Sequence, residues 1–282
     1  MIDLHMHTVY SDGNSTPDEL ISALAAQKLE AFAVTDHDTV ESLPHVREAA
    51  KETGMTVIPG IEINTYLDDQ EIHVLGYYID PEGEALQEVI RQHQENRVVQ
   101  MQEMAVKLKK VAKVDITYEE IIAISGQGTP GRPHVAQLLI NKGAVANMGQ
   151  AFAKFLSSKC PGYVRRKTVT PHEAVEAIYE SGGIPVIAHP GDMENIETLA
   201  TEMMNYGLRG LEAYHRSHSP ALIEFHCSLA EKLDLIVTGG TDFHGPGDAY
   251  AKAWERVRMP GYVYDRLKAD NQQRQMSMFK AS

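Results

Sequence analysis

The stretch Ile2-Asp3-Leu4-His5-Met6-His7 carries the pattern that decides the fold, a short apolar run with ligand-type side chains at its end. Residues i and i+2 of a strand project to one face, so His5 and His7 can bind the same ion. Four later apolar runs end in the same way, at His37, Glu62, His189 and His244. Strands that deliver such residues at their carboxyl ends, repeated around a closed sheet, form one metal-binding mouth, which indicates a hydrolase.

Strand and helix signals alternate through both ends of the chain. Two helix starts, Thr16-Pro17-Asp18-Glu19 and Thr170-Pro171-His172-Glu173, combine an N-cap threonine, a proline at the first helical position and an acid at the third. About seven strands are expected, at residues 1–7, 31–35, 55–61, 71–78, 184–188, 210–213 and 235–239. This alternation predicts an α/β fold with a closed or nearly closed barrel, active at the carboxyl ends of its strands.

The middle of the chain lacks strand signals, and long polar helices are predicted there instead, at 84–113, 117–124, 132–141 and 147–158. We therefore expect a barrel domain of residues 1–80 and 163–282, with a helical insertion at 81–162 that caps the site. A separate interaction module is the alternative for the insertion. The polar stretch 270–282 is predicted to fray.

The composition limits the classes of function. At 282 residues and 43% hydrophobic, the chain can bury a sizeable core in one main domain. The formal net charge of -13 argues against broad attraction to phosphate backbones, so an extended nucleic-acid duplex is not an expected partner. Cys160 and Cys227 are too few and too far apart for a disulfide framework. With no apolar run of roughly 20 residues and no signal-peptide pattern, we expect a cytoplasmic protein without membrane or obligate protein partners.

Side chains of ligand type recur at the predicted strand ends and in the loops beside them. The candidates are His5, His7, Asp12, His37, Glu62, His73, His189, Asp242 and His244. A lone histidine inside an apolar strand, such as His73, is more often a core residue, and only the company of the others changes that interpretation. The set is too large for one ion of four to six coordination, so it predicts two or three divalent cations that share a carboxylate. Imidazole and carboxylate ligands suit manganese, with zinc or iron as alternatives.

Two acids flank one of these histidines. Asp36 and Asp38 stand on either side of His37. They either orient imidazoles from behind, as carboxylates beside metal ligands do, or cap the next helix. Both interpretations fit the sequence.

Short motifs follow one another in a fixed order: His5-Met6-His7-Thr8, Ser11-Asp12-Gly13, Thr35-Asp36-His37, Gly60-Ile61-Glu62, His73-Val74-Leu75-Gly76, Ala188-His189-Pro190 and Thr241-Asp242-Phe243-His244. Together they resemble the PHP (polymerase and histidinol phosphatase) superfamily, from residue 1 to about residue 255. The resemblance implies a distorted, TIM-like seven-stranded (β/α) barrel with a trinuclear metal centre that hydrolyses phosphoesters. It implies one ion on His5, His7, Glu62 and Asp242, a second on Asp12, His37 and His244, and a third on Glu62, His73 and His189.

Later motifs narrow the resemblance. Gly131-Arg132-Pro133-His134 and Tyr214-His215-Arg216-Ser217-His218 are similar to the standalone metal-dependent phosphoesterases of the superfamily, which include nucleoside 3′,5′-bisphosphate phosphatases and 5′-to-3′ exoribonucleases. The likeness implies substrate-phosphate contacts from Arg132, His134, His215 and His218. A guanidinium can grip a phosphate through its planar fork, although a surface arginine at a capped helix start gives the same pattern. The basic run Arg165-Arg166-Lys167 is either a solvated cluster or a substrate clamp.

We therefore expect a metal-dependent phosphoric ester hydrolase, in which a hydroxide activated by the cations attacks phosphorus in line. The expected substrate is a small nucleotide, either a nucleoside 3′,5′-bisphosphate or the 5′ end of a short RNA. The alternatives are a histidinol-phosphate-type phosphomonoesterase and a noncatalytic metal-dependent nucleotide-binding protein. A cyclic-amide hydrolase with a similar barrel is more distant, because no predicted strand offers a clear metal-bridging lysine.

Overall fold

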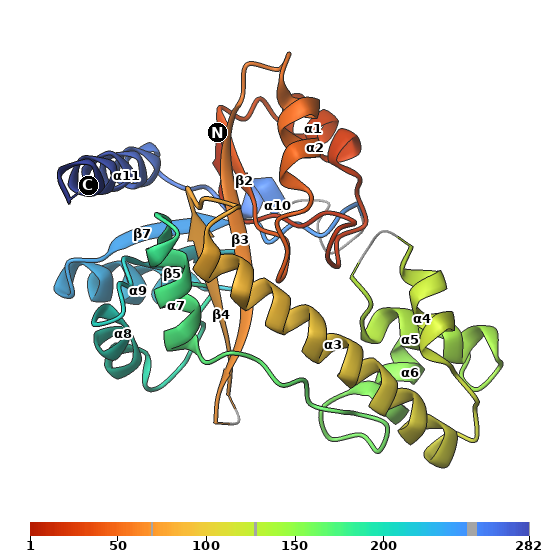
Figure 1. The fold of residues 1–282 in the computed structure, drawn as a ribbon. Coiled ribbons are helices and arrows are strands. Elements are labelled where there is room, and N and C mark those ends of the chain that lie inside the picture. The colour runs from red at the N-terminus through yellow and green to blue at the C-terminus, as the bar shows by residue number, and fades with distance from the viewer. Residues whose placement is uncertain (69, 127–128, 247–252, 282) are drawn as a thin grey trace. The chain divides into compact units, whose positions relative to one another are not determined.

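The computed structural model describes residues 1–68, 70–126, 129–246 and 253–281. One sheet holds seven strands in chain order (Figure 1): β1 (Ile2–Asp3), β2 (Ala31–Val34), β3 (Thr56–Leu67), β4 (Gln70–Tyr77), β5 (Ile184–Ile187), β6 (Gly210–His215) and β7 (Ile236–Gly240). The first strand also approaches the last, because the Leu4 N–H donates to the Gly239 carbonyl at 3.2 Å and Met6 bridges Phe243. The predicted α/β class and nearly closed barrel are confirmed.

β3 and β4 form a hairpin, and the strand pairs that do not include β4 run parallel. β4 is antiparallel to both β3 and β5. The link from Leu67 to Gln70 is too short for the crossover that a parallel pair needs. The prediction that the third strand ends at residue 61 is wrong, because residues 61–65 stay buried and β3 continues to Leu67. Glu62 therefore lies inside a paired strand, opposite Leu75.

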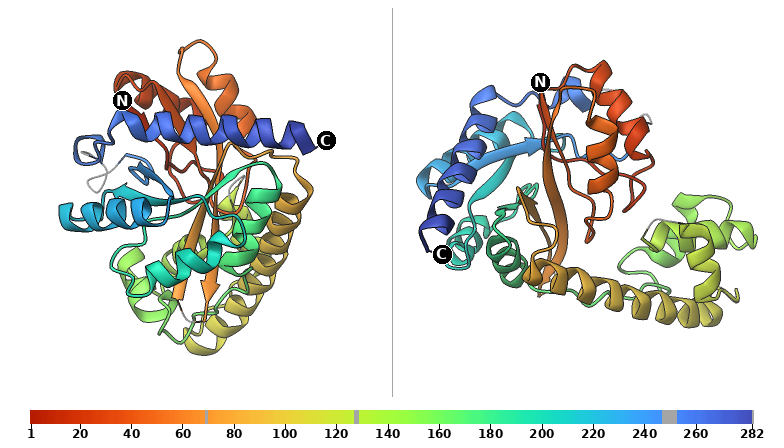
Figure 2. Two further views of the ribbon diagram at one scale, coloured as in Figure 1. Left: turned by 90° about the vertical axis from the view of Figure 1, so that its left-hand side faces the viewer. Right: turned by 45° about the horizontal axis from the view of Figure 1, so that its top comes forward.

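Helices cover the outside of this sheet in the first of two compact units, which comprises Met1–Ile90 and Val169–Ser282 (Figure 2). The helix starts predicted at Thr16 and Thr170 are confirmed, and each threonine forms a capping box with the glutamate three residues later. The helices of this unit are α1 (Pro17–Ala26), α2 (Leu43–Ala50), α7 (Pro171–Glu180), α8 (Ile196–Met204), α9 (Pro220–Lys232), α10 (Ala253–Arg256) and α11 (Gly261–Ala281).

The last helix, α11, corrects the expectation of a frayed end. Leu267 is fully buried among strand residues, and Asp270 forms an ion pair with Arg209, the residue before β6. The guanidinium of Arg274 stacks on Tyr179, with its carbon 3.8 Å from the ring centroid. These contacts anchor a polar helix whose composition alone predicts a solvated end.

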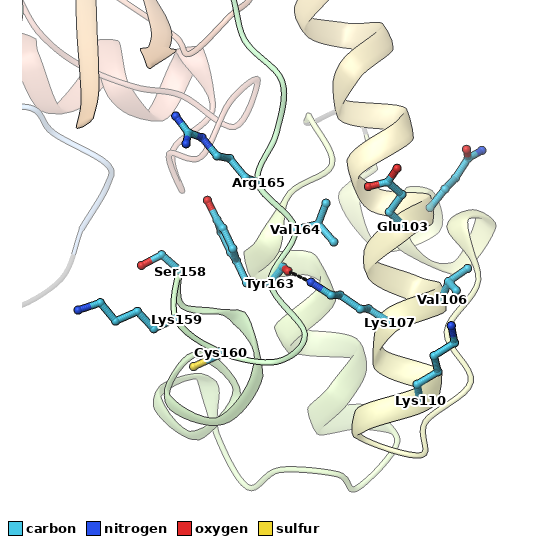
Figure 3. A pocket seen from close by; sticks show the side chains of 11 residues that line it. Glu103, Val106, Lys107, Lys110, Ser158, Lys159, Cys160, Tyr163, Val164 and Arg165 are labelled. Atoms are coloured by element: carbon cyan, nitrogen blue, oxygen red, sulfur yellow. Dashed lines mark hydrogen bonds between the residues drawn. The ribbon is translucent and has the colours of Figure 1, made fainter. Parts of the chain in front are cut away.

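The second compact unit, Arg91–Thr168, is helical and has its own core. Its described part holds most of α3 (Glu84–Val111), with α4 (Tyr118–Ser125), α5 (Arg132–Asn141), α6 (Met148–Ala151) and the π-helical turn η1 (Phe152–Leu156). Leu108 and Leu139 are fully buried in this core, and the Lys107 side chain donates to the Tyr163 carbonyl at 2.6 Å (Figure 3). That residues 81–162 form an insertion that caps the site stays a prediction. Nowhere in the described ranges is a helix long and apolar enough to cross a membrane.

Candidate metal centre

The close approach of β1 to β7 positions the first pair of candidate ligands. Met6 is fully buried between His5 and His7 and bridges Phe243, so both imidazoles point to the other face. A Cβ atom at Gly240 would lie 2.3 Å from the Cβ of His5, so only glycine permits this approach.

Glu62 lies at the middle of the cluster and is only 1% exposed. One of its oxygens, Oε2, lies 3.0 to 3.3 Å from ring nitrogens of His5, His7 and His37. The other, Oε1, lies 2.8 Å from His73 Nδ1 and 3.1 Å from His189 Nε2. Burial alone would raise the pKa of this carboxyl group, but the surrounding imidazoles, His37 first, hold it well below its usual value. Glu62 is therefore a charged group that the fold surrounds with ligand nitrogens.

Asp242 approaches the same group from the loop after β7. Its Oδ1 lies 3.2 Å from His7 Nε2 and 3.5 Å from His5 Nε2. The same oxygen is 3.5 Å from His244 Nδ1, two residues along the chain. The backbone of Asp242 has a φ of 52°, in the left-handed region, which directs this short loop back toward the barrel mouth.

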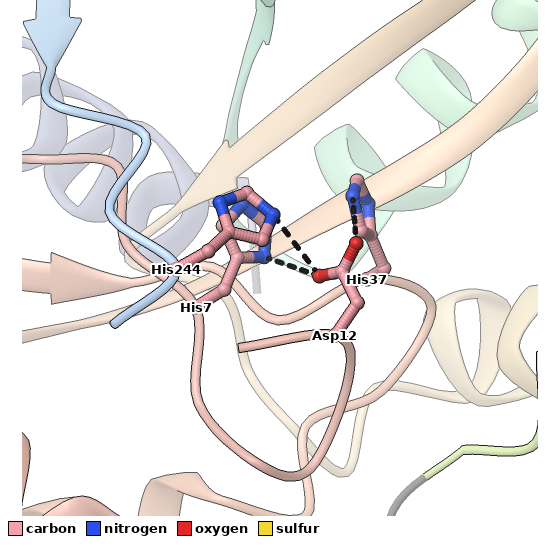
Figure 4. A group of neighbouring side chains, drawn as sticks. All are labelled: His7, Asp12, His37 and His244. Atoms are coloured by element: carbon pink, nitrogen blue, oxygen red, sulfur yellow. Dashed lines mark ion pairs between the residues drawn. The ribbon is translucent and has the colours of Figure 1, made fainter. Parts of the chain in front are cut away.

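Asp12 closes the outer side of the cluster, and Figure 4 shows it between three imidazoles. Its Oδ1 lies 3.1 Å from His244 Nε2 and 3.7 Å from His7 Nδ1, and its Oδ2 lies 3.8 Å from His37 Nε2. The side chain of Asp12 is 44% exposed, whereas that of His7 is fully buried. Asp12 therefore marks the side of the centre that faces solvent.

The pKa values of these histidines depend on two opposing effects, burial and the nearby carboxylates. Burial lowers the pKa of His37 to about 4, so its imidazole is neutral near pH 7 and charged only at the low pH where Glu62 titrates. Burial also opposes charge on His7 and His73, but the carboxylates of Asp242 and Glu62 beside His7, and of Glu62 beside His73, raise the pKa of both to about 10. Protons or divalent cations can supply this positive charge, and cations compete with protons for the same nitrogens.

Three groups of side chains bring their ligand atoms within 4.8 Å of one another: His7, Asp12, His37 and His244; His5, His7, Glu62 and Asp242; His37, Glu62 and His73. Their chemistry fits divalent cations, because His5 Nε2 faces His7 Nε2 at 3.2 Å, and buried nitrogens of His7, His37 and His73 have no hydrogen-bond partner in the described part of the chain. The first group adds His7 to the set that the resemblance implies for one ion. The third holds His37 where the resemblance implies His189, whose Nε2 still lies 3.1 Å from Glu62.

Glu212 is a buried carboxylate beside the candidate ligands to which the sequence analysis assigned no role. It is fully buried, its Oε1 lies 3.0 Å from His5 Nδ1, and its Oε2 accepts from the His189 backbone N–H at 2.8 Å. A carboxylate behind one ring nitrogen directs the other nitrogen, here Nε2, toward a metal. The available signal was a charge inside an apolar strand, Leu211-Glu212-Ala213, where an unpaired carboxylate is costly.

Asp3 plays a similar part on β1 and was also missed. It is 1% exposed and accepts hydrogen bonds from the Thr241 N–H at 2.9 Å, the Thr241 hydroxyl at 2.6 Å and the Trp254 indole at 2.8 Å. These bonds fix the residue that precedes Asp242. Asp3 therefore connects the first strand to the loop that carries a candidate ligand.

Asp36 neither orients an imidazole nor caps a helix, so both interpretations of this residue are wrong. It accepts from the Thr8 N–H at 2.7 Å, the Thr8 hydroxyl at 2.8 Å and the Ser11 hydroxyl at 2.6 Å. It thus holds the loop that carries Asp12. Asp38 accepts two bonds at 2.9 Å from the backbone and side chain of Asn64 in β3.

The predicted phosphate contacts after β6 separate into two cases. His215 Nε2 has no hydrogen-bond partner among the described residues and lies 3.5 Å from Asp242 Oδ2, at the edge of the cluster. Both nitrogens of His218 bond to the backbone, Nδ1 to the Ala213 carbonyl at 2.8 Å and Nε2 to the Gly191 N–H at 3.1 Å. His218 therefore has no ring nitrogen left for a phosphate, and its contacts fix the loop after His189.

The other two predicted phosphate contacts lie in the second unit. The guanidinium carbon of Arg132 lies 6.0 Å from the ring centroid of Phe152 and 5.7 Å from that of Tyr163. His134 Nδ1 accepts from the Gly131 N–H at 3.0 Å. The role of both residues in binding a phosphate stays a prediction.

A family model gives the relationship that this geometry suggests. The model of the PHP domain matches residues 3–157. The chain belongs to this family. It is 32% identical to the 5′-3′ exoribonuclease Rnm of Salmonella typhimurium, over 86% of this chain and 85% of the relative. It is also 32% identical to the 3′,5′-nucleoside bisphosphate phosphatase of Chromobacterium violaceum, over 88% of each chain.

The fold of this PHP protein also matches a solved structure. A crystal structure from Bifidobacterium adolescentis is described as that of a metal-dependent phosphoesterase. Its alignment with this chain covers 94% of each, with a TM-score of 0.82 and 29% sequence identity. The predicted family, the subgroup it resembles and the class of enzyme are confirmed. The protein is a metal-dependent hydrolase of phosphoesters, and its clustered histidines and carboxylates are the groups that could hold the metal.

Proposed function

We propose that this PHP protein hydrolyses phosphate esters of nucleotides, either nucleoside 3′,5′-bisphosphates or the 5′ ends of short RNA. The observation that carries the proposal is the convergence of histidines and carboxylates on Glu62. Two relatives named for such activities align with this chain over 85% or more of their own length. The formal net charge of -13 favours a small or end-bound substrate over an extended duplex.

The donor set supports two or three divalent cations. Glu62, His7 and His37 each belong to two of the three ligand groups. The two oxygens of Glu62 could serve two ions, whereas a neutral imidazole has one free lone pair, so His7 and His37 would each serve one ion. Imidazole and carboxylate ligands favour manganese, with zinc or iron as alternatives. When bound, such ions would lower the pKa of water to supply the nucleophile and would neutralise the phosphate.

The chain's own residues position the reacting groups. Glu212 accepts a hydrogen bond from His5 Nδ1, so the other ring nitrogen of His5, Nε2, faces the centre. Asp36 fixes the loop of Asp12, the candidate ligand nearest to solvent. His215 Nε2 lies 3.5 Å from Asp242 and is placed to contact a substrate oxygen or to donate a proton to the leaving group.

The second unit would supply a phosphate contact from Arg132. Its guanidinium lies against the rings of Phe152 and Tyr163, which restrict the orientation of the planar fork before substrate arrives. His134 would add a donor to the same phosphate, because its Nδ1 accepts from the Gly131 N–H and the proton of the neutral ring is then on Nε2. His218 is not included for the reason given above.

Phosphate release from purified protein tests the proposal. Protein prepared without chelator should contain divalent metal and release phosphate from adenosine 3′,5′-bisphosphate or shorten a 5′-phosphorylated RNA, in preference to histidinol phosphate. His5→Ala and Asp242→Ala should each lower turnover by at least roughly a thousandfold. His172→Ala, on the outer helix α7, is the matched control. Near-normal release by the site variants with unchanged metal content would refute the proposal.

A further inference from the structure

An open pocket in the second unit gathers cationic side chains (Figure 3). It has a volume of about 690 Å³ and lies between α3 and residues 158–165, which precede α7. Its lining includes four basic residues, Lys107, Lys110, Lys159 and Arg165, and one acid, Glu103. In a chain with a formal net charge of -13, this local reversal of charge in a cavity of ligand size indicates an anionic ligand.

Two of these cations are available to a ligand. Lys110 and Lys159 are exposed, and within the described ranges neither ammonium group has a hydrogen-bond or ion-pair partner. Their neighbours differ, since Lys109 pairs with Asp115 at 2.9 Å and Lys107 donates to the Tyr163 carbonyl. Lys110 and Lys159 come from α3 and from the loop after η1, so they reach the pocket from two sides.

The same pocket offers apolar surface beside its charges. Val106 is 59% exposed and lines the cavity together with the half-buried Val164 and Tyr163. An anion that is only a phosphate would leave this surface in water. A ligand that combines phosphate esters with flat, weakly polar rings would cover it, which is the chemistry of a nucleotide.

We propose that this pocket is a second nucleotide-binding site, made from residues separate from those of the metal centre. It binds phosphate esters through Lys110 and Lys159 and covers Val106 and Val164 with a base. The ligand class rests on the proposed function. The phosphate esters can come from two sources, the backbone of an RNA substrate or a free mononucleotide.

Binding of a short 5′-phosphorylated RNA with a hydrolysis-resistant backbone tests the site in the metal-loaded full-length protein. We compare Lys110→Gln with Lys159→Gln in one variant against a control that combines Lys109→Gln and Lys154→Gln. The control removes the same charge from α3 and from η1, which directly precedes the loop of Lys159, and both of its residues lie outside the pocket lining. Two phosphate contacts on a single strand contribute about 1.4 to the slope of log affinity against log salt concentration. Over the tenfold range from 1 M to 0.1 M salt, this slope corresponds to a roughly 25-fold gain in affinity.

The pocket variant should therefore bind RNA roughly 25-fold more weakly at 0.1 M salt and with a shallower salt slope, while the control stays close to the unaltered protein. Equal binding by the two variants would overturn the inference. Phosphate release from the bisphosphate keeps the two proposals apart. If no nucleotide is hydrolysed but the lysine pair still matters for binding, the proposed function fails alone, and if turnover is intact without a lysine effect, only the pocket fails.

Cys160 lines the pocket and reports on its occupancy. In a Cys227→Ser background, ligand should slow the reaction of Cys160 with a thiol reagent, and the lysine pair variant should lose this protection. Protection by RNA but not by adenosine 5′-phosphate identifies the backbone as the source, and protection by adenosine 5′-phosphate identifies a free nucleotide. A reaction rate that neither ligand changes at saturation would show that the pocket is not a nucleotide site.

Discussion

The metal centre of the first unit and the lysine pocket of the second hold charge in opposite ways. At the metal centre, Glu62 and Glu212 are almost completely buried and each oxygen lies about 3 Å from a nitrogen. In the pocket, Lys110 and Lys159 are exposed and their charge faces solvent. Buried charges interact strongly and need each partner, whereas exposed charges act nearly independently and are screened by salt.

This difference predicts how each region responds to the loss of one group. Removing a single oxygen of Glu62 disturbs several ligands, because each of its two oxygens lies near more than one imidazole. Removing a single ammonium group from the pocket changes one contact.

Glu62→Gln should have the largest effect. The amide keeps the shape of the side chain but replaces one shared oxygen with a nitrogen that cannot accept from imidazole or bind a cation. We expect loss of bound metal and a fall in phosphate release of at least roughly a thousandfold. Metal analysis of the purified variant and steady-state turnover check this result.

Glu71→Gln is the control for Glu62→Gln. Glu71 lies on the neighbouring strand, its side chain is 49% exposed, and it lies 3.5 Å from His73 Nε2. An exposed pair is worth up to about 1 kcal/mol, so turnover should change by less than about fivefold. Full metal content in Glu62→Gln, or equal losses in the two variants, would contradict the central place assigned to the buried carboxylate.

Glu212→Gln should have the second-largest effect, because both oxygens of Glu212 accept hydrogen bonds. One partner is the ring of His5 and the other is the backbone N–H of His189, and an amide offers only one accepting oxygen to the two donors. The loss of such a partner behind a ligand typically weakens metal binding by about 10- to 100-fold. Titration with metal against a competing chelator measures this change. Glu224→Gln, on the exposed side of α9, should leave the affinity unaltered.

Asp36→Asn should act on stability more than on metal affinity. Asp36 accepts three hydrogen bonds from Thr8 and Ser11, and an amide nitrogen cannot accept the bond from the Thr8 hydroxyl. Because the side chain is 1% exposed, water does not replace the lost bond, and we expect a loss of about 2 kcal/mol in the free energy of unfolding. Denaturant melts of the metal-free protein measure it. An unchanged midpoint would show that the loop of Asp12 does not depend on this clamp.

The sequence predicts the candidate metal ligands better than the residues that position them. His5, His37 and Asp242 could be identified because an apolar run ends beside each of them, which is a local pattern. His73 and Glu62 meet through the β3–β4 hairpin, and only its antiparallel register places them near each other. The direction of β4 is implied by the short turn, but the length of β3 depends on burial from both sides, which the local pattern does not reveal.

The residues behind the ligands were missed for a physical reason. Asp3 and Glu212 are single acids inside apolar strands, and each is stabilised by partners far along the chain, such as Thr241 for Asp3 and His5 for Glu212. His218 carries the residue type of a phosphate contact but bonds to two backbone groups. In such cases the residue type suggests a chemistry, and only the tertiary contacts show whether the atoms are free for it.

The smallest expected effect compares the two units directly through matched capping boxes. In α4 the Thr117 hydroxyl accepts from the Glu120 N–H at 3.2 Å, and in α7 the Thr170 hydroxyl accepts from the Glu173 N–H at 3.3 Å. Thr117→Ala and Thr170→Ala should each cost about 1 kcal/mol. Because each unit has its own core, we expect Thr117→Ala to speed amide hydrogen exchange within residues 91–168 and Thr170→Ala to speed it in the barrel. If Thr117→Ala instead speeds exchange equally in the barrel strands, the two units unfold together, and the contrast between them is one of charge alone.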